Sequence, residues 1–528
     1  MFSSTTRAVV ALVAGLVAVG ACAANDGATA SGAASGSGSQ ARHPEAVRRL
    51  VEAAEPARAG VEYRDGAAPP TAIGGGEDRA PSIAVTGAIV PGGPAVAVTL
   101  APGAPRARFR FSATAGTGYG LALTGVSYAP SPGNVTAILR TGEGAALTRC
   151  SFGPSSSCNL DPSMFAATAA YVLDFESDGV AVTSFTAVLT ADASGTLAID
   201  GDAAVASLRA GQNARYQFRG TAGQLVTVVI SGNTLDDGNP DTTHDTNVLV
   251  FPPSGPGASP IGSLVMATVT SALTLDLTLP ETGDYTIWID PVALDRGSVH
   301  VAVTSYAQGP LPVDRVATVD LGLGQNARYN FTATAGIGYA IAITRLRFTP
   351  AAGQLQVRLL RADGTLVASC GFFAPMSCNI DPGAVPTTGT YFVEFDPTEV
   401  TATSLGAVLS TEVTGTIAIG GKARITTTLP GQNARYRFDG TAGRTVNVVL
   451  SNDSIDDDDL GNGNGTGVVV LQPDGSAIAR ATIQIPRPGE DPALHVRTIA
   501  VTLPETGTYT ILIDPQGLDR GSVTLALR

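Results

Sequence analysis

Lysine is almost absent from this chain, and charge of either sign is sparse. Lys422 is the only lysine among 528 residues, so lysine–asparagine isopeptide crosslinks, which stiffen some surface adhesins, are excluded from all but one segment. Charged residues make up 15% of the chain, and the net charge is -13. Because nucleic acids and anionic membranes bind basic surfaces, this acidic balance argues against both as partners.

Recognisable catalytic motifs are also lacking. The chain has no H-E-x-x-H, no G-x-S-x-G and no cysteine–histidine arrangement with a free thiol. Its four histidines (43, 244, 300 and 495) lie at unrelated places in the sequence, so no two of them form a recurring motif. The carboxylate pairs Asp290/Asp295 and Asp514/Asp519 recur in I-D-P-x-x-L-D-R-G, which we interpret as a structural turn with Asp295–Arg296 and Asp519–Arg520 as exposed charge. We therefore predict that the chain is not an enzyme; a secreted hydrolase with an unrecognised site is the alternative.

The N-terminus has the pattern of an export signal. Arg7 precedes an uncharged, mostly apolar run, 8–21, that is too short to span a bilayer. Val19-Gly20-Ala21-Cys22 resembles a bacterial lipobox, which predicts a signal segment at 1–22 and lipidation of Cys22; ordinary cleavage just after Cys22 is the alternative. An Ala/Gly/Ser-rich flexible linker with a short helix at 43–56 is expected over 23–80.

An internal repeat organises the rest of the chain. GQNARYQF begins at 211, GQNARYNF at 324, GQNARYRF at 431, and a degraded copy, APRARFRF, at 104. Four units follow from this repeat, at 81–193 (A1), 194–304 (B1), 305–413 (A2) and 414–528 (B2). Units A1 and A2 share paired cysteines, whereas B1 and B2 share acidic loops and LPETG, so an A–B pair has been duplicated.

Within each unit the hydrophobic period is two. Tyr285, Ile287 and Ile289 fall on one face of GDYTIWIDP, and GTYTILIDP repeats the pattern at 507–515. Such alternation predicts half-buried strands. We therefore expect an all-β fold of four tandem antiparallel jelly-roll-like β-sandwiches.

The order of these strands resembles the bacterial pre-peptidase C-terminal domain. The resemblance rests on a Tyr-x-Phe strand, a following T-A-G, an apolar strand, a P-D-G-like turn and a closing G-T-Y-T-I-x-I-D strand, and it covers 81–528 in four copies. It implies a compact, jelly-roll-like fold that is usually appended to secreted enzymes. Some members bind calcium and a protein or polysaccharide. This chain has no peptidase domain, so no ligand specificity is carried over.

LPETG occurs at 279–283 and at 503–507, and in exported proteins it can be a sortase signal. Such a signal needs a hydrophobic span and a basic tail after it, and neither copy has them. We interpret both copies as turns, in which proline pre-sets φ and Gly283 and Gly507 adopt a positive φ.

The cysteines support an oxidising compartment. Apart from Cys22, they form two C-x7-C pairs, Cys150/Cys158 and Cys370/Cys378. No histidine or further cysteine lies close by to complete a zinc site, so disulfides are expected.

Two features suggest ligand contacts. Trp288, the only tryptophan, opposes the core-facing residues of its strand; burial under a neighbouring loop or unit is the preferred interpretation, and a binding surface is the alternative. The aligned acidic loops at 231–247 and 451–467 suggest calcium, because carboxylate and amide oxygens are its ligands. The candidate ligands are Asp236, Asp237, Asn239, Asp241 and Asp245 in the first loop, and Asp456, Asp457, Asp458 and Asp459 in the second.

Together these patterns predict a non-catalytic extracytoplasmic protein that binds an extracellular glycan or protein through its tandem units. A passive stalk that holds another factor away from the membrane is the alternative. The expected location is the cell surface or periplasm, with the N-terminal lipid as the only membrane contact, or else outside the cell.

Overall fold

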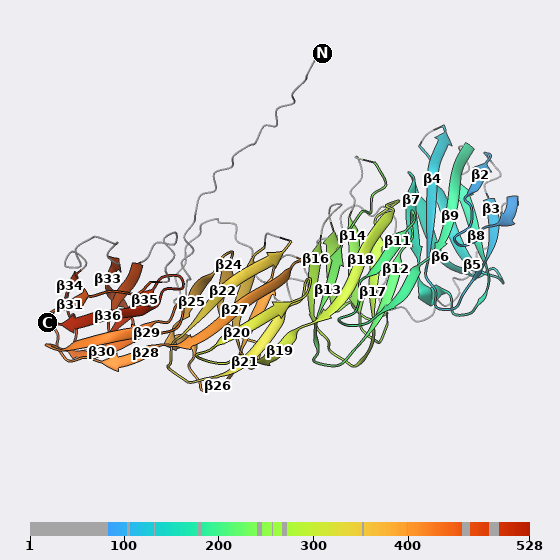
Figure 1. Ribbon diagram of the computed structural model, residues 1–528. Helices are drawn as coiled ribbons and strands as arrows, with labels where there is room; N and C mark the ends of the chain where they lie inside the picture. Colours follow the sequence, from blue (N-terminus) through green and yellow to red (C-terminus); the bar gives the residue numbers. More distant parts are fainter. Residues whose placement is uncertain are drawn as a thin grey trace, which may run out of the picture.

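A computed structural model describes residues 83–102, 106–130, 132–177, 182–239, 245–255, 257–266, 272–350, 353–398, 400–456, 465–484 and 496–528. This part of the chain is all-β, with two single-turn 3-10 helices, η1 (Pro162–Met164) and η2 (Pro382–Ala384). Figure 1 shows an elongated array whose four units follow one another in sequence order.

The described residues of the first A–B pair form eighteen strands, nine in each unit. Unit A1 comprises β1 (Ile83–Ala88), β2 (Val96–Leu100), β3 (Arg106–Ala113), β4 (Tyr119–Ala129), β5 (Val135–Thr141), β6 (Ala146–Phe152), β7 (Ser156–Leu160), β8 (Ala169–Ser177) and β9 (Val182–Ala191). Unit B1 comprises β10 (Ala193–Leu197), β11 (Ala204–Leu208), β12 (Ala214–Gly220), β13 (Leu225–Ser231), β14 (Thr246–Phe251), β15 (Gly262–Met266), β16 (Leu273–Thr278), β17 (Gly283–Pro291) and β18 (Gly297–Ser305).

The second pair repeats the first strand for strand. Unit A2 comprises β19 (Ala307–Pro310), β20 (Val316–Leu321), β21 (Ala327–Ala333), β22 (Tyr339–Thr349), β23 (Leu355–Arg361), β24 (Leu366–Phe372), β25 (Met376–Ile380), β26 (Gly389–Pro397) and β27 (Ala402–Thr411). Unit B2 comprises β28 (Val413–Thr416), β29 (Lys422–Thr427), β30 (Ala434–Gly440), β31 (Thr445–Ser451), β32 (Gly465–Leu471), β33 (Ala477–Gln484), β34 (Arg497–Thr502), β35 (Gly507–Pro515) and β36 (Gly521–Leu527).

Each unit contains a five-stranded and a four-stranded sheet. In A1 the orders are β1-β3-β8-β5-β6 and β2-β9-β4-β7, and the other three units repeat them. Residues from both sheets form one hydrophobic cluster in each unit, and in B1 that cluster includes Tyr285, Ile287 and Ile289, all fully buried. The alternation seen in the sequence therefore marks the face of β17 that packs on this core.

The prediction of tandem antiparallel jelly-roll-like β-sandwiches is wrong. The first strand of every unit pairs in parallel with the third, as β10 does with β12, so each five-stranded sheet is mixed. In B1, A2 and B2 the first strand follows the last strand of the preceding unit after a single residue, whereas β1 of A1 has the same pairing without a described predecessor. The molecule is a continuous, solenoid-like array of repeated sheets, in which units contact their neighbours along the chain (Figure 1), and not a row of separate jelly rolls.

Each LPETG copy forms a turn in which most positions have a structural role. Leu503 is fully buried, and the hydroxyl of Tyr509 donates to the Glu505 carbonyl (2.7 Å) and accepts from its amide (3.2 Å). The hydroxyl of Thr506 accepts from the Ala442 amide at 3.0 Å. The first copy has the same contacts, from Leu279 and Tyr285 to the neighbouring backbone.

The expected reason for glycine in these turns needs correction. Gly283 has a φ of 159°, at the edge of the extended region, and Gly507 is not among the residues of positive φ. A Cβ at either glycine would instead lie 2.6 Å from a proline Cγ, that of Pro253 or Pro473. Space, more than a left-handed backbone, requires glycine here.

Candidate functional site

A single residue links each unit to the next. Asp192 lies between β9 and β10, Tyr306 between β18 and β19, and Glu412 between β27 and β28. All three are buried, with 8–9% of their surface exposed. Their amides donate to a carbonyl of the preceding unit, at Gly118, Leu225 and Gly338 respectively. The linkers are thus part of the packed structure.

The GQNARY repeat is the motif that builds these three junctions. Its glutamine donates through Nε2 to the last carbonyl of the preceding unit, at 2.8 Å for Gln212, 2.9 Å for Gln325 and 2.9 Å for Gln432. The carbonyl of its asparagine accepts from the first amide after the linker in every case. The copy in A1, before which no unit is described, reads APRARFRF and lacks both side chains.

Glycine begins the motif because the neighbouring unit leaves no room for a side chain. A Cβ at Gly431 would lie 2.3 Å from Ser377, and one at Gly324 would lie 2.8 Å from Val229. Both glycines also have φ near +64°, a conformation that disfavours other residues.

The arginine of the motif forms a buried ion pair at the A2–B2 junction. Arg435 donates from Nε and Nη2 to the two carboxylate oxygens of Glu412, at 2.8 and 2.9 Å, and also contacts Asp381 at 3.3 Å. The two main side chains are only 9% and 2% exposed. This bidentate geometry fixes the linker residue against β30 of B2.

The A1–B1 junction has a weaker version of the same contact. Asp192, one methylene shorter than Glu412, accepts from Arg215 Nε through Oδ2 at 2.6 Å, and its Oδ1 has no partner within the described part of the chain. Burial raises the pKa of Asp192 and of Asp161, which faces the same guanidinium at 3.4 Å.

A second polar contact braces each A–B junction. Asn159 donates to Asp290 at 2.9 Å in A1–B1, and Asn379 donates to Asp514 at 2.8 Å in A2–B2. Burial raises the pKa of Asp514. Asp290 and Asp514 therefore hold units together, a role that their repetition in the sequence did not identify.

Trp288 belongs to the A1–B1 junction and is not an exposed binding surface. Only 6% of the residue is exposed, and the Arg215 guanidinium lies 4.5 Å from its ring centroid. The same arginine pairs with Asp192 of the linker. Burial, the preferred interpretation of the sequence, is confirmed, and Leu512 takes this strand position in B2.

The B1–A2 junction gathers three carboxylates and two arginines. Asp276 accepts from Thr227 and from Asn326, both at 2.7 Å, and Asn326 also contacts the linker hydroxyl of Tyr306 at 3.2 Å. On the A2 side the ion pairs are Arg328–Glu394, Arg358–Glu394 and Arg358–Asp396. Burial, reinforced by the charge of Asp276, raises the pKa of Asp396 to about 6.

Acidification is expected to strengthen the B1–A2 junction. The pKa of Asp396 is about 6 in the folded chain, above its ordinary value of 3.8, so the folded state binds this proton first as the pH falls. The stabilisation is fully present below pH 3.8 and is lost as the pH rises to about 6. From pH 7 to pH 5, Asp396 should add about 1 kcal/mol to the free energy of local opening at this junction, measured by hydrogen exchange on peptides from β23 and β26. Asp396→Asn should reduce the gain by that amount; an equal gain in both proteins would contradict the assignment.

The described acidic-loop residues bond mainly to nearby backbone. Asp236 accepts from the Gly238 amide at 2.5 Å, and Asp237 accepts from the Asn239 amide at 2.8 Å. The carbonyl of Asp245 accepts from the Val292 amide at 3.0 Å, and Asp456 and Arg520 exchange backbone hydrogen bonds.

Asp241, Asp457, Asp458 and Asp459 lie outside the described residues, as do Cys22 and the helix expected at 43–56. Within the described ranges no three His, Cys, Asp or Glu side chains converge on a metal position, and calcium stays a prediction.

Of the charges expected to be exposed in the L-D-R-G turns, Arg296 and Arg520 are exposed but the two aspartates are buried. Asp295 is 1% exposed and Asp519 is 0% exposed. Each turn packs against the start of the acidic loop. A Cβ at Gly297 would lie 2.3 Å from the Thr234 carbonyl oxygen, and a Cβ at Gly521 would lie 2.1 Å from the Ser454 carbonyl oxygen. The sequence signal for this burial is the glycine two residues after each aspartate, because glycine is needed where another segment packs closely on the turn.

The cysteines form the expected pairs. Cys150 and Cys158 are joined, with Cα atoms 6.2 Å apart, and Cys370 and Cys378 are joined, with Cα atoms 6.4 Å apart. Each pair joins an edge strand of the five-stranded sheet to an edge strand of the four-stranded sheet in an A unit, β6 to β7 in A1 and β24 to β25 in A2. Such pairs are typical of proteins in oxidising compartments.

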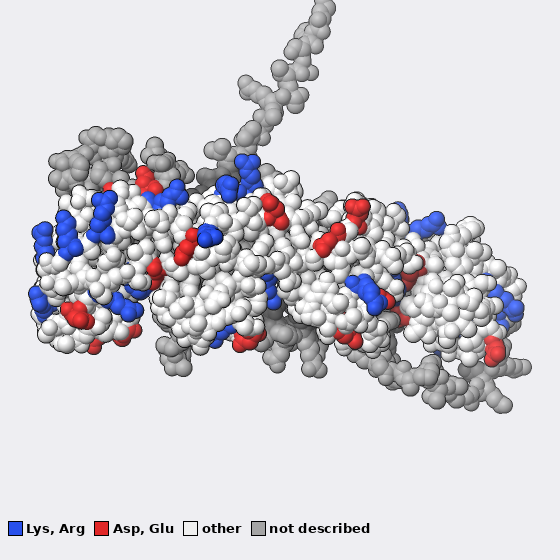
Figure 2. Space-filling view, turned by 60° about the horizontal axis from the view of Figure 1, so that its bottom comes forward, with Lys and Arg blue, Asp and Glu red and all other residues white. Residues whose placement is uncertain are grey.

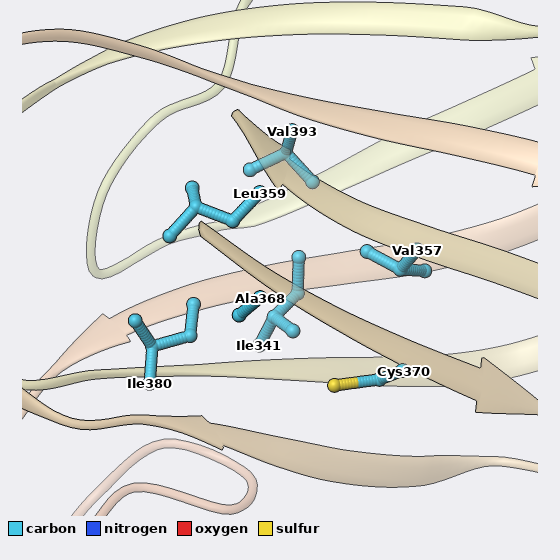
Figure 3. Close-up of a pocket in the computed structure, with 7 residues that line it drawn as sticks. All are labelled: Ile341, Val357, Leu359, Ala368, Cys370, Ile380 and Val393. Carbon is cyan, nitrogen blue, oxygen red and sulfur yellow. The ribbon is translucent and has the colours of Figure 1, made fainter. Parts of the chain in front are cut away.

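The gap found in the A2 core is too small for anything larger than a water molecule. Figure 3 shows a gap in the A2 core, lined by apolar side chains such as Ile341, Leu359 and Val393, with a volume of about 10 Å³. That is near the lower limit for one water molecule. On the face in Figure 2, acidic and basic side chains are scattered along the array among uncharged ones.

Comparisons with known proteins do not identify a family. No family model matches the chain, and no curated protein matches its sequence. Among solved structures, PliG of Aeromonas hydrophila, a periplasmic inhibitor of g-type lysozyme, is 15% identical, with 22% of this chain and 99% of PliG covered and a TM-score of 0.15. The CUB1-EGF-CUB2 region of human MASP-1/3 is 9% identical, with 40% and 99% covered and a TM-score of 0.16. These scores carry no functional argument.

Within the described residues, no helix has the length and apolarity needed to cross a membrane.

Proposed function

We propose that this chain is a non-catalytic spacer: a stiff extracytoplasmic rod that holds an attached or associated factor at a fixed distance from its anchor. The observation that carries the proposal is the one-residue linker, buried and hydrogen-bonded at each of the three junctions. Flexible connections between domains need exposed, Gly- or Ser-rich segments. The linkers here have the opposite properties.

The repeat itself supports the proposal. GQNARY occurs in each unit that packs against a described predecessor, and its Gly, Gln and Asn all act at the junction. The sequence therefore specifies the relation between units as well as their cores. A protein whose units bound ligands independently would not need this constraint.

The proposed location is the cell surface or periplasm, with lipidated Cys22 as the anchor and the paired cysteines formed in an oxidising compartment. Export and anchoring rest on the N-terminal pattern of the sequence. The rod would then project from the membrane, and its length would set the distance of its far end.

Small-angle X-ray scattering of residues 83–528 should fit one rigid, elongated shape. Inserting Gly-Gly-Ser-Gly-Gly-Ser after Asp192, Tyr306 and Glu412 together should replace that shape by an ensemble of bent ones. The same insertions in exposed hairpin turns, after Glu143, Asp363 and Asp474, are the matched control and should leave the overall shape unchanged. A native chain whose scattering requires an ensemble of unit orientations would overturn the spacer proposal.

The repeat also allows the rod to be shortened cleanly. Deleting residues 193–412 removes one B–A pair and joins Asp192 directly to Val413, which recreates an A–B junction. With a tag at the C-terminus of the anchored protein, the deletion should bring the tag closer to the membrane, as measured by fluorescence energy transfer to a membrane dye. An unchanged distance would contradict a spacer role.

A further inference from the structure

We propose that unit A2 carries a docking surface for an acidic segment of a partner protein, a function additional to spacing. The surface, called the A2 patch, consists of Arg345, Arg347, Phe373 and Met376. The two arginines lie on β22 and are exposed. Phe373 lies in the loop between β24 and β25 and is 73% exposed, and Met376 begins β25 and is 50% exposed. Aromatic, methionine and arginine side chains are the types that protein interfaces favour.

The four side chains lie at one place because the loop passes a β-bulge. Strands β22 and β25 are antiparallel, with Ile343 paired with Met376, so the loop before Met376 runs beside the residues after Ile343. There the register of β22 shifts, at Arg345. In A1 the same loop contacts the same bulge, where the Val126 amide donates to the Ser155 hydroxyl at 3.2 Å. Loop and bulge therefore form one surface.

The fold of an A unit does not require the patch. Units A1 and A2 have the same strands, the same bulge and disulfides with the same sequence separation of 8. The A1 residues at the four patch positions are small and uncharged: Gly125, Ser127, Gly153 and Ser156. Two arginines and two large apolar side chains thus occur together in one copy of a unit that folds without them in the other.

Arg345 is retained against the preference of its backbone. Its φ is 53°, and Gly125 at the same bulge in A1 has a φ of 60°. Glycine is the usual residue in this left-handed conformation, and other residues kept there concentrate at functional sites. The facing strand leaves room for the side chain: a Cβ at Gly406 would lie 3.3 Å from Arg345 Nη2, and A1 has Thr186 at this position. These paired changes favour a use for the guanidinium other than folding.

The two arginines of the patch are not used by the fold. Among the described residues neither guanidinium has an ion-pair partner, whereas Arg328 and Arg358 of the same unit both pair with Glu394. Unit A2 therefore contains arginines that hold its structure together and, at the patch, two that are available to a ligand.

The patch is positive on an acidic molecule. One carboxylate shares its face: Arg347 is opposite Ser404, and Ser404 donates to Asp320 of the next strand at 2.6 Å. Two guanidinium groups exceed this single charge, whereas the whole chain carries -13. An acidic segment is thus attracted to the patch and repelled by the rest of the surface. Its carboxylates bond the arginines, and an apolar side chain beside them packs on Phe373 and Met376.

A protein segment is favoured over a membrane as the occupant. Recognition of anionic lipid takes a cluster of basic residues, and the patch has two on a chain with a net charge of -13. The Cys370–Cys378 disulfide closes the loop, which limits the conformational freedom that Phe373 loses on binding a partner.

The test is selection from a phage-displayed library of random dodecapeptides on the full chain carrying Cys22→Ala, which removes the predicted lipid. Enriched peptides should combine several carboxylates with an aromatic or aliphatic residue. A synthetic peptide of the enriched sequence should bind with a Kd of about 10–100 µM in isothermal titration. Arg345→Gly/Arg347→Ser and Phe373→Gly/Met376→Ser, which copy A1, should each weaken binding at least tenfold, and the first should also remove its salt dependence.

Leu366→Ser is the matched control and should leave binding unchanged, because Leu366 is 51% exposed at the start of β24, outside the patch. Melting temperatures check that every variant is folded, as expected from the A1 residues at the same positions. Four results would overturn the patch: no enriched peptide, enrichment of peptides without carboxylates, equal binding by either patch variant, or binding of the chain to phosphatidylserine vesicles in place of peptides. Scattering tests the spacer proposal independently, so either proposal can fail without the other.

Discussion

Arg435→Met is expected to lower the free energy of unfolding of the A2–B2 part by about 3–5 kcal/mol, because it leaves a buried carboxylate without its partner. Arg435 bonds both oxygens of Glu412, whose side chain is 2% exposed, and no other guanidinium reaches it among the described contacts. The cost is the desolvation of that carboxylate. Removing a positive charge as such would cost far less.

Hydrogen exchange in urea, followed by mass spectrometry on peptides from β27, β28 and β30, would locate the loss at the junction. A four-unit chain need not unfold in one step, so local opening is the appropriate measurement. Arg435→Met/Glu412→Leu, which removes both charges, should recover most of the stability. Arg219→Met, whose side chain is 74% exposed in its pair with Asp284, should cost less than about 1 kcal/mol. A loss that small for Arg435→Met would show that the junction does not depend on this pair.

The local patterns in the sequence predicted the strands well. Alternation placed Tyr285, Ile287 and Ile289 on one face, and the structure buries all three. The paired cysteines are close enough to join. These features depend on neighbours within one strand or hairpin, where the period of two and the spacing of the chain determine the geometry.

The relation between units could not be predicted in the same way. Strand β10 follows the last strand of A1 after a single residue and pairs in parallel with β12, and alternation within a strand predicts neither. The repeat GQNARY was visible, yet its partners, such as the carbonyls of Ala191 and Thr411, lie in the preceding unit. A clue was present in the degraded A1 copy, which lacks a described predecessor.

Trp288 shows the limit of reasoning from one face of a strand. Alternation correctly placed Trp288 on the face of β17 that points away from the B1 core. That face is buried at the A1–B1 junction and is not exposed to solvent. Asp295 and Asp519 were misjudged for a similar reason, since the acidic loops fold over their turns. Burial by a distant segment leaves only indirect signals, such as a glycine that approaches another backbone.

Leu503→Ala is expected to be the most destabilising single change within LPETG, at about 2–5 kcal/mol. The Leu503 side chain is fully buried in the B2 core and lies over Gly440, where an added Cβ would come within 2.3 Å of its Cδ1. The site cannot collapse easily, because Gly440 has no side chain to move into the cavity. Calorimetry of the chain should show an early transition confined to B2.

Glu505→Ala is the matched control, because Glu505 is exposed and contributes only its backbone groups to Tyr509. Its effect should stay within about 0.5 kcal/mol. A sortase signal would depend on the motif as a recognition sequence, whereas a structural turn depends on Leu503 and tolerates alanine at Glu505. Leu279→Ala and Glu281→Ala should repeat the contrast in B1, because Leu279 is equally buried and Tyr285 makes the same backbone contacts. Equal losses from the leucine and glutamate variants would mean that the motif is not held by its buried leucine.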